Sequence, residues 1–239
     1  MRHLPLACVA ILAAFAACAD NGHDDPNAQS PTDPTVSCKQ AETAPAPLTR
    51  LNSREYRNTV SDLFGVEGSA SLPADNVPAN FGYDNSVHNA SVSQLRADAL
   101  FASAATIGEA VAQQLDTMLP CETSSADGAC IDAFIHTLGR RIYRRPLDDA
   151  EHAALRKIDD AAVVRGDALQ VRIELIVQAM SFAPQFIYKA EIGEATAEAA
   201  APGLVALSDH ELATRLAYLL WASTPDDVLL DVAAAGGLS

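Results

Sequence analysis

The chain has 239 residues, of which 49% are hydrophobic, and its formal net charge is -15. This apolar content is enough for a buried core and argues against a chain that is disordered as a whole. With only 16 lysines and arginines, the chain offers no basic face for nucleic acid, and its acidity disfavours attraction to an anionic bilayer surface.

The N-terminus is typical of a secretory signal peptide. Arg2 and His3 precede an apolar run that ends at Phe15 and is too short to span a bilayer, and small residues then lead to Cys18. The segment FAAC resembles a bacterial lipobox, in which cleavage leaves an acylated cysteine at the N-terminus. We predict a lipoprotein-type signal peptide in residues 1–18 with Cys18 as the lipidation site; an ordinary signal peptide cut near the same place is the alternative.

Residues 19–47 predict a flexible, disordered tether. They have no apolar period and are rich in Pro, Asp, Asn and Ser, so this segment should stay solvated. Together with the lipid anchor, this predicts an exported lipoprotein at the periplasmic side of the inner or outer membrane, or at the cell surface.

Export changes the interpretation of the cysteines. Cys121 and Cys130 flank a short polar loop, and in an oxidising compartment this spacing predicts a disulfide. Cys38 is left over and is free to pair with either of them or with a missing partner. No CxxC or CxxCH occurs, so a zinc ribbon and a covalent c-type haem both lack ligands, and no cofactor is evident.

A first helical domain is expected over residues 48–118. Asn52 can cap a helix while Glu55 bonds back to its amide, and that helix should end at Gly65. A long polar loop follows, and helical periodicity returns over residues 91–118. The expected apolar face consists of Leu95, Ala99, Ala102, Ile107, Val111 and Leu115.

The polar loop between these helices contains a candidate metal site. Asp75, Asp84, Asn85 and Asn89 supply oxygen ligands at short spacing, which suits a hard cation such as calcium, although the spacing is not that of an EF-hand. Asx turns that fix the loop are the alternative.

A second helical domain is expected over residues 121–192, and its main feature is the segment FIHTLGRRIYRRPL. On a helix its four arginines would lie beside an apolar stripe, one turn apart in pairs; they are Arg140, Arg141, Arg144 and Arg145. Ion pairs that join neighbouring helices are one interpretation, and a site for an anionic ligand is the other. His136 in this segment and the more distant His210 have no His or Cys one helical turn away, so neither predicts a metal site.

Two further helices should complete this domain. Asp148 and Glu151 form a capping pair for the first, Gly166 ends it, and Asp167 is expected to cap the second, which Pro184 ends.

The start of a third helical domain is expected over residues 204–239. Ser208 and Glu211 form another capping pair. One apolar face follows, with Trp221 at its end, and consists of Leu212, Leu216, Leu219 and Leu220. No strand pattern occurs anywhere, so the predicted fold is all-α, a bundle of about seven helices with long polar loops.

Three blocks together resemble the planctomycete cytochrome-associated domains of unknown function. They are LTRLNSREYRNTVSDLFG with the loop that ends in FGYDN, then FIHTLGRRIYRRPLDDAE through GDALQVRIELIVQAMSFAPQFIYKAE, and then LSDHELATRLAYLLWASTPDDVLLDVAAAGGL. The resemblance implies large exported bacterial proteins, often fused to c-type cytochrome domains, of which this chain would be a truncated member. It implies no established reaction.

No motif for nucleophilic, zinc-protease, phosphate-loop or dinucleotide chemistry occurs. The leading hypothesis is therefore a non-catalytic, lipid-anchored module of the cell envelope that docks to a protein partner, such as a cytochrome-bearing protein. The alternative is an enzyme that acts on exported polymers as part of a cytochrome-associated system, with the acidic residues of the polar loop opposite the arginines.

Overall fold

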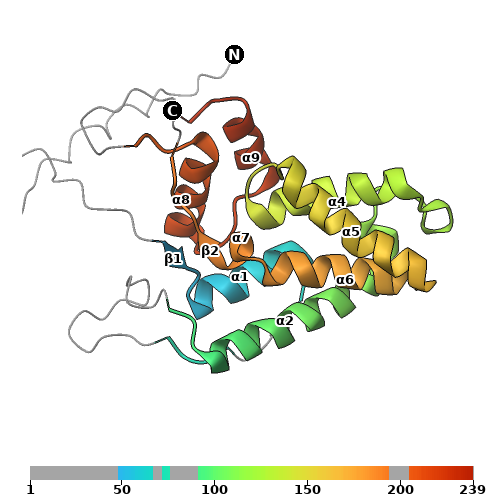
Figure 1. Cartoon of the computed structure of the whole chain (residues 1–239). Helices are drawn as coiled ribbons and strands as arrows, with labels where there is room; N and C mark the ends of the chain where they lie inside the picture. Colours follow the sequence, from blue (N-terminus) through green and yellow to red (C-terminus); the bar gives the residue numbers. More distant parts are fainter. Residues whose placement is uncertain (1–47, 67–71, 76–90, 194–204, 239) are drawn as a thin grey trace, which may run out of the picture. The chain divides into compact units, whose positions relative to one another are not determined.

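The structure, a computed structural model, describes residues 48–66, 72–75, 91–193 and 205–238, and these are mostly helical (Figure 1). The all-α prediction is confirmed. The segments expected as separate domains, 48–118, 121–192 and 204–239, all lie within one unit that spans residues 44–239. Within the described residues, no helix is both long and apolar enough to cross a membrane.

Helix α1 (Ser53–Phe64) begins and ends as the sequence predicts. The Asn52 side chain accepts a bond of 2.8 Å from the Glu55 amide, and the Glu55 carboxylate accepts one of 2.9 Å from the Asn52 amide. Gly65, with a φ of +64°, ends the helix in the left-handed conformation that glycine tolerates. Local sequence chemistry therefore sets both ends of α1.

Helices α2 (Gln94–Ala112) and α3 (Leu115–Met118) replace the single helix expected over residues 91–118. The expected apolar face is correct over its second half, where Ile107, Val111 and Leu115 are buried. It was wrong over the first half, where Leu95 and Ala102 are exposed and Leu100 is buried instead. The reason is composition: alanines lie on all sides of this helix, and periodicity alone does not choose among its faces.

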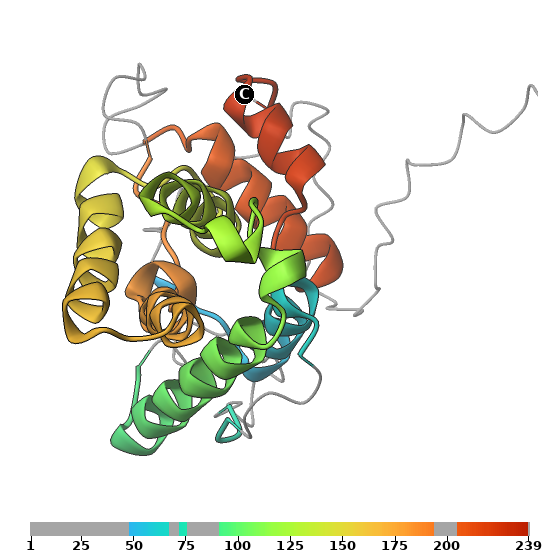
Figure 2. The same ribbon diagram turned by 90° about the vertical axis from the view of Figure 1, so that its right-hand side faces the viewer.

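Besides α1, four longer helices contribute side chains to the main core, and Figure 2 shows how they are arranged. They are α2, α4 (Gly128–Tyr143), α5 (Asp149–Arg165) and α6 (Leu169–Phe182). Figure 1 shows α6 between α2 and α5, and Ile173, Ile176 and Met180 on α6 are fully buried. The apolar side chains of α6 therefore lie at the centre of the core.

The boundaries of α5 are as predicted, but the start of α6 is not. Asp148 and Glu151 cap α5 reciprocally, and Gly166 ends it at a φ of +78°. Asp167 does not cap α6; its carboxylate instead accepts a bond of 3.0 Å from Arg165 Nε, and α6 starts without a side-chain cap. The N-cap residue of α6 is Ala168, so Asp167 lies one residue before the capping position.

Two short strands, β1 (Thr49–Arg50) and β2 (Tyr188–Lys189), correct the expectation of no strands. They pair antiparallel, with Thr49 opposite Lys189 and Arg50 opposite Tyr188. Two residues are too few to show an alternating pattern, so these strands have no sequence signal. The pair joins the start of the first helical segment to the end of the second, just after the short helix α7 (Pro184–Ile187).

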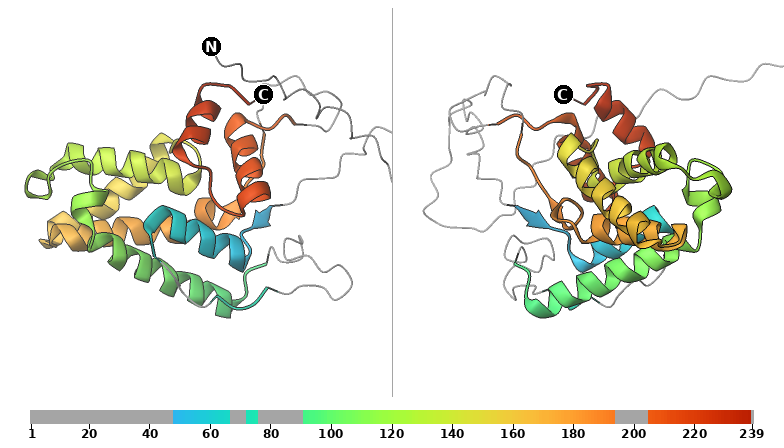
Figure 3. Two further views of the ribbon diagram at one scale, coloured as in Figure 1. Left: turned by 180° about the vertical axis from the view of Figure 1, so that it is seen from behind. Right: turned by 45° about the vertical axis from the view of Figure 1, so that its right-hand side comes forward.

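Helices α8 (Asp209–Trp221) and α9 (Asp227–Ala234) pack against each other at the C-terminal end of the chain (Figure 3). The predicted capping pair of Ser208 and Glu211 is present. The buried side of α8 contains Ala213, Ala217 and Tyr218 and is not its leucine-rich face.

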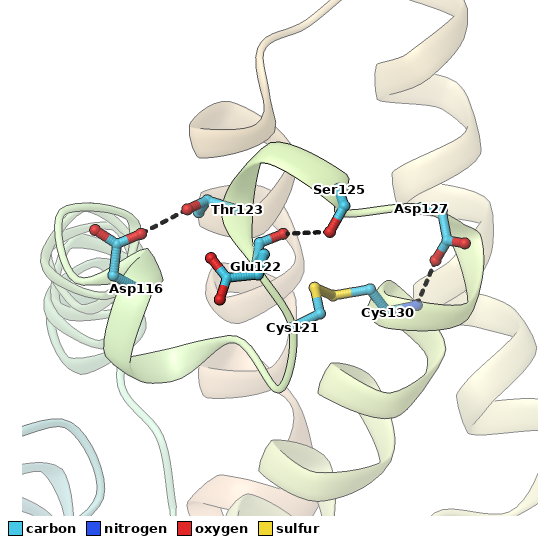
Figure 4. The surroundings of a disulfide bond; sticks show 7 residues. All are labelled: Asp116, Cys121, Glu122, Thr123, Ser125, Asp127 and Cys130. Atoms are coloured by element: carbon cyan, nitrogen blue, oxygen red, sulfur yellow. Dashed lines mark hydrogen bonds between the residues drawn. A yellow bond between two sulfur atoms is a disulfide. The ribbon is translucent and has the colours of Figure 1, made fainter.

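The predicted disulfide between Cys121 and Cys130 is present, with their Cα atoms 6.0 Å apart (Figure 4). Asp127 caps α4 by accepting a bond of 3.0 Å from the Cys130 amide, and the 3-10 helix η2 (Thr123–Ser125) lies within the closed loop. The bond to Asp127 thus fixes the Cys130 end of the loop.

We expect removal of this disulfide to lower the free energy of unfolding by roughly 2 to 3 kcal/mol, because the cross-link restricts the unfolded chain. Thermal unfolding of the Cys121→Ala/Cys130→Ala variant, compared with the oxidised parent, measures this loss. An unchanged melting temperature would show that the loop closure contributes nothing.

Candidate functional site

The arginine segment lies where α4 ends. The helix stops at Tyr143, and Arg144 takes a left-handed conformation with a φ of +59°. Only Arg140 and Arg141 therefore lie on the helix, and the expected one-turn pairing with Arg144 and Arg145 was wrong. Arg144 and Arg145 follow the end of the helix and so do not keep the helical spacing.

Arg144 is buried and binds the end of α7. Its Nη2 donates to the carbonyl oxygens of Gln185 at 2.6 Å and Tyr188 at 2.8 Å, and both terminal nitrogens also reach the carbonyl of Phe186. Its Nη1 further donates to the Tyr218 hydroxyl at 3.2 Å. A single guanidinium thus connects α4 to the α7–β2 turn and to α8.

Tyr218 is the centre of a buried polar cluster. Its hydroxyl lies 2.9 Å from the Thr59 hydroxyl, and Lys189 Nζ lies 5.0 Å from the centroid of its ring. Lys189 in turn bonds to Glu55 at 2.7 Å. Burial raises the pKa of Tyr218, so its phenol stays protonated and able to donate. The cluster joins residues from α1, α4, β2 and α8.

The other three arginines pair with carboxylates. Arg140 and Arg141 bind Asp231 and Asp227 on α9, and these two pairs are partly exposed. Arg145 forms a two-point pair with Glu151 at 2.8 and 2.9 Å, and hydrogen bonding to this carboxylate raises the pKa of Arg145. All four arginines therefore contact acidic side chains or helix-end carbonyls, as the structural interpretation predicts.

A cavity of about 300 Å³ lies beside the arginine segment. Its lining comes from the end of α4, from α7, from residues 188–192 and from the first turns of α8, and it also includes Leu48. Glu211 lines it, but the amides of Ile192, Gly193 and Ser208 already donate to this carboxylate. Burial alone would raise the pKa of Glu211, yet these backbone bonds hold it below its ordinary value.

His210 also lines the cavity. Its Nε2 is buried and has no hydrogen-bond partner among the described residues. Burial, together with the positive charges of Arg140 and Arg145, lowers the pKa of His210, so the ring is neutral near pH 7. His210 therefore lies at the cavity wall with a neutral ring and one buried, unsatisfied nitrogen.

Of the candidate metal ligands, the structure places Asp75, whereas Asp84, Asn85 and Asn89 lie outside the described residues, as do Cys18 and Cys38. The Asp75 carboxylate lies 2.9 Å from Arg50 and 3.1 Å from Arg96, and it accepts a bond from the Ser53 amide. It therefore bridges two cations instead of facing the arginine segment. Among described residues, no group of three His, Cys, Asp or Glu side chains could hold a metal.

We expect Asp75→Asn to lower the free energy of unfolding at pH 7 by about 1 to 2 kcal/mol, because it leaves two buried arginines without their shared carboxylate. Burial acts to raise the pKa of Asp75, but bonds from Ser53 and Arg50 hold it below its ordinary value of 3.8. The stability it adds is thus present above that ordinary value and is lost as the pH falls through its lower folded-state pKa.

Urea unfolding of parent and Asp75→Asn at pH 7 and near pH 3 tests this prediction. The difference between the two should shrink at the lower pH. A difference that stays constant would mean that the charge on Asp75 is not the source of the effect.

Sequence reasoning missed a stacked histidine pair. The rings of His136 on α4 and His152 on α5 are stacked with centroids 4.3 Å apart, and His152 Nε2 lies 3.3 Å from Asp132 Oδ1. A search within one helical turn cannot detect a contact between two helices.

Three family models match the chain, one for each of the three segments described from the sequence. Residues 49–113 match the family described as a protein of unknown function, DUF1587; residues 130–191 match DUF1595; and residues 207–239 match DUF1592. The chain therefore belongs to the family built from the planctomycete cytochrome-associated domains of unknown function, as the resemblance predicted. No curated protein and no solved structure matches it.

Proposed function

We propose that this chain is an exported, lipid-anchored helical module of the bacterial cell envelope that docks to a protein partner and does not catalyse a reaction. The observation that carries the proposal is the apolar stripe of α8, which is formed by Leu216, Leu219, Leu220 and Trp221 and is exposed. Leu219 is 75% exposed and Trp221 is 63% exposed.

The stripe differs from isolated exposed apolar residues, which are normal on protein surfaces. Leu216, Leu219 and Leu220 are spaced as neighbours on one face of a helix, and Trp221 follows them directly. Contiguous exposed apolar surface marks interaction sites, and tryptophan is enriched where binding energy concentrates. In α9, Val228 is also 73% exposed. Family membership suggests a cytochrome-bearing envelope protein as the partner.

The residues of the cavity give less support to the rival function, an enzyme that acts on exported polymers. The enzyme hypothesis rests on carboxylates that converge in a cleft and are free to exchange protons. Glu211 is occupied by three backbone amides, and Arg145 is occupied by Glu151. The calcium site predicted at Asp75, Asp84, Asn85 and Asn89 stays a prediction, although the Asp75 carboxylate is bound by Arg50 and Arg96.

Native electrophoresis of envelope complexes extracted in mild detergent tests the docking role. The parent should migrate in an assembly larger than the chain alone, and Leu219→Ser/Trp221→Ser should release it. The matched control is Val163→Ser/Val164→Ser, which changes two exposed valines on α5 and should leave the assembly intact. Equal migration of all three proteins would argue against docking through α8.

The lipid anchor makes a separate prediction. We expect the mature protein to begin at an acylated Cys18 and to partition with membranes, whereas Cys18→Ser should be found in the soluble fraction. Mass spectrometry of the native N-terminus and membrane fractionation measure the two outcomes. An unmodified N-terminus, or membrane association that survives in Cys18→Ser, would remove the lipoprotein interpretation without affecting the docking test.

A further inference from the structure

The cavity beside the arginine segment has the size of a small-molecule site. Its volume of about 300 Å³ is at the lower end of the range for ligand pockets, and its lining is mainly apolar. Tyr143, Tyr188 and Ile192 contribute to that lining. These features favour a compact ligand with an apolar body.

The charged groups around the cavity already have partners. Arg144 is bound to carbonyls, Arg145 to Glu151, and Glu211 to backbone amides. Burial raises the pKa of Tyr143 to about 12, so its phenol adds no charge. A charged ligand would therefore lose its hydration without gaining a free counter-ion, and the anionic ligand considered from the sequence is disfavoured.

His210 is different because its Nε2 is buried and unsatisfied within the described part of the chain. A buried polar atom without a partner is costly, and a ligand group that bonds to it would remove that cost. A neutral imidazole nitrogen can accept or donate one hydrogen bond. The ligand therefore needs one polar group as well as an apolar body.

We propose that this cavity binds a small, uncharged, mainly apolar molecule, and that the His210 ring turns so that its buried Nε2 makes a hydrogen bond to that molecule. The site is independent of the docking stripe: it lies at the first turns of α8, whereas the stripe occupies the last turns of that helix.

Fluorescence titration with N-phenyl-1-naphthylamine tests the proposal, because this probe is neutral and apolar and carries one N–H group. We expect saturable binding of one molecule per chain. Ala190→Trp, which places a large ring in the lining, should weaken binding at least tenfold, and His210→Phe should weaken it about fivefold. If Ala190→Trp does not fold, Ile192→Trp, at a lining residue that is 79% exposed, replaces it.

Two controls distinguish binding in this cavity from binding elsewhere on the protein. Leu219→Ser removes part of the exposed stripe and should leave probe binding unchanged, so a loss there would place the probe on the stripe and overturn the proposal. The sulfonated analogue 8-anilino-1-naphthalenesulfonate should bind at least tenfold more weakly, and tighter binding would show an anion site instead. Binding that Ala190→Trp and Ile192→Trp leave intact would also overturn the assignment.

Discussion

Replacement of Arg144 with alanine is expected to lower the free energy of unfolding by about 3 to 5 kcal/mol, which corresponds to a fall of roughly 10 °C in melting temperature. The variant removes the donors that serve the carbonyls of Gln185, Phe186 and Tyr188 and the hydroxyl of Tyr218. These acceptors are mostly buried, so water cannot fully replace the guanidinium.

Two variants make the Arg144 test specific. Arg141→Ala removes a partly exposed pair of 3.7 Å and should cost about 1 kcal/mol or less. Arg144→Gly loses the same bonds as Arg144→Ala but suits the φ of +59°, so it should be more stable than Arg144→Ala by about 1 kcal/mol. If Arg144→Ala has the same melting temperature as the parent, the arginine segment does not hold these helices together. The anionic-ligand interpretation would then gain support.

The second large effect is expected at Gly108, where α2 approaches α6. A Cβ atom at this position would lie 2.7 Å from the Glu174 carbonyl oxygen and 3.2 Å from Glu174 Cγ. Gly108→Val should therefore force the two helices apart and lower the free energy of unfolding by at least about 3 kcal/mol. Chemical unfolding measures the loss.

Gly128→Val is the matched control, because a Cβ at Gly128 would only make an ordinary contact of 3.6 Å with the end of the Arg156 side chain. Glycine and valine are both poor helix formers, so intrinsic helix propensity contributes little to either variant. Equal stability of the two variants would show that the close approach of α2 and α6 is not what limits residue size at Gly108.

Sequence reasoning predicted the parts of this fold that depend on local chemistry. The capping pairs at Asn52, Asp148 and Ser208 and the ends at Gly65 and Gly166 involve residues within one helical turn of each other. The first half of the predicted buried face of α2 was wrong, because tertiary contact with α6, rather than apolar content, selects that face. The strand pair β1–β2 was missed because it joins residues far apart in the sequence.

The contacts of the candidate site were also missed, because they join residues far apart in the sequence. The sequence indicates the arginine segment as a candidate site, because four arginines in six positions are unusual in an acidic chain. Its partners were unpredictable, since Arg144 binds the carbonyls that follow α6 and Arg140 binds α9. The cavity has no sequence signal at all, because its lining comes from four separate segments.

Site-specific photo-crosslinking from position 219 in intact cells tests the docking role most directly. A photoreactive residue there should form a covalent product with one envelope protein, identifiable by mass spectrometry, and Trp221→Asp should abolish that product. The control position is Val164, which is 88% exposed on α5 and should give no product. No product from position 219, or the same products from both positions, would contradict the docking role.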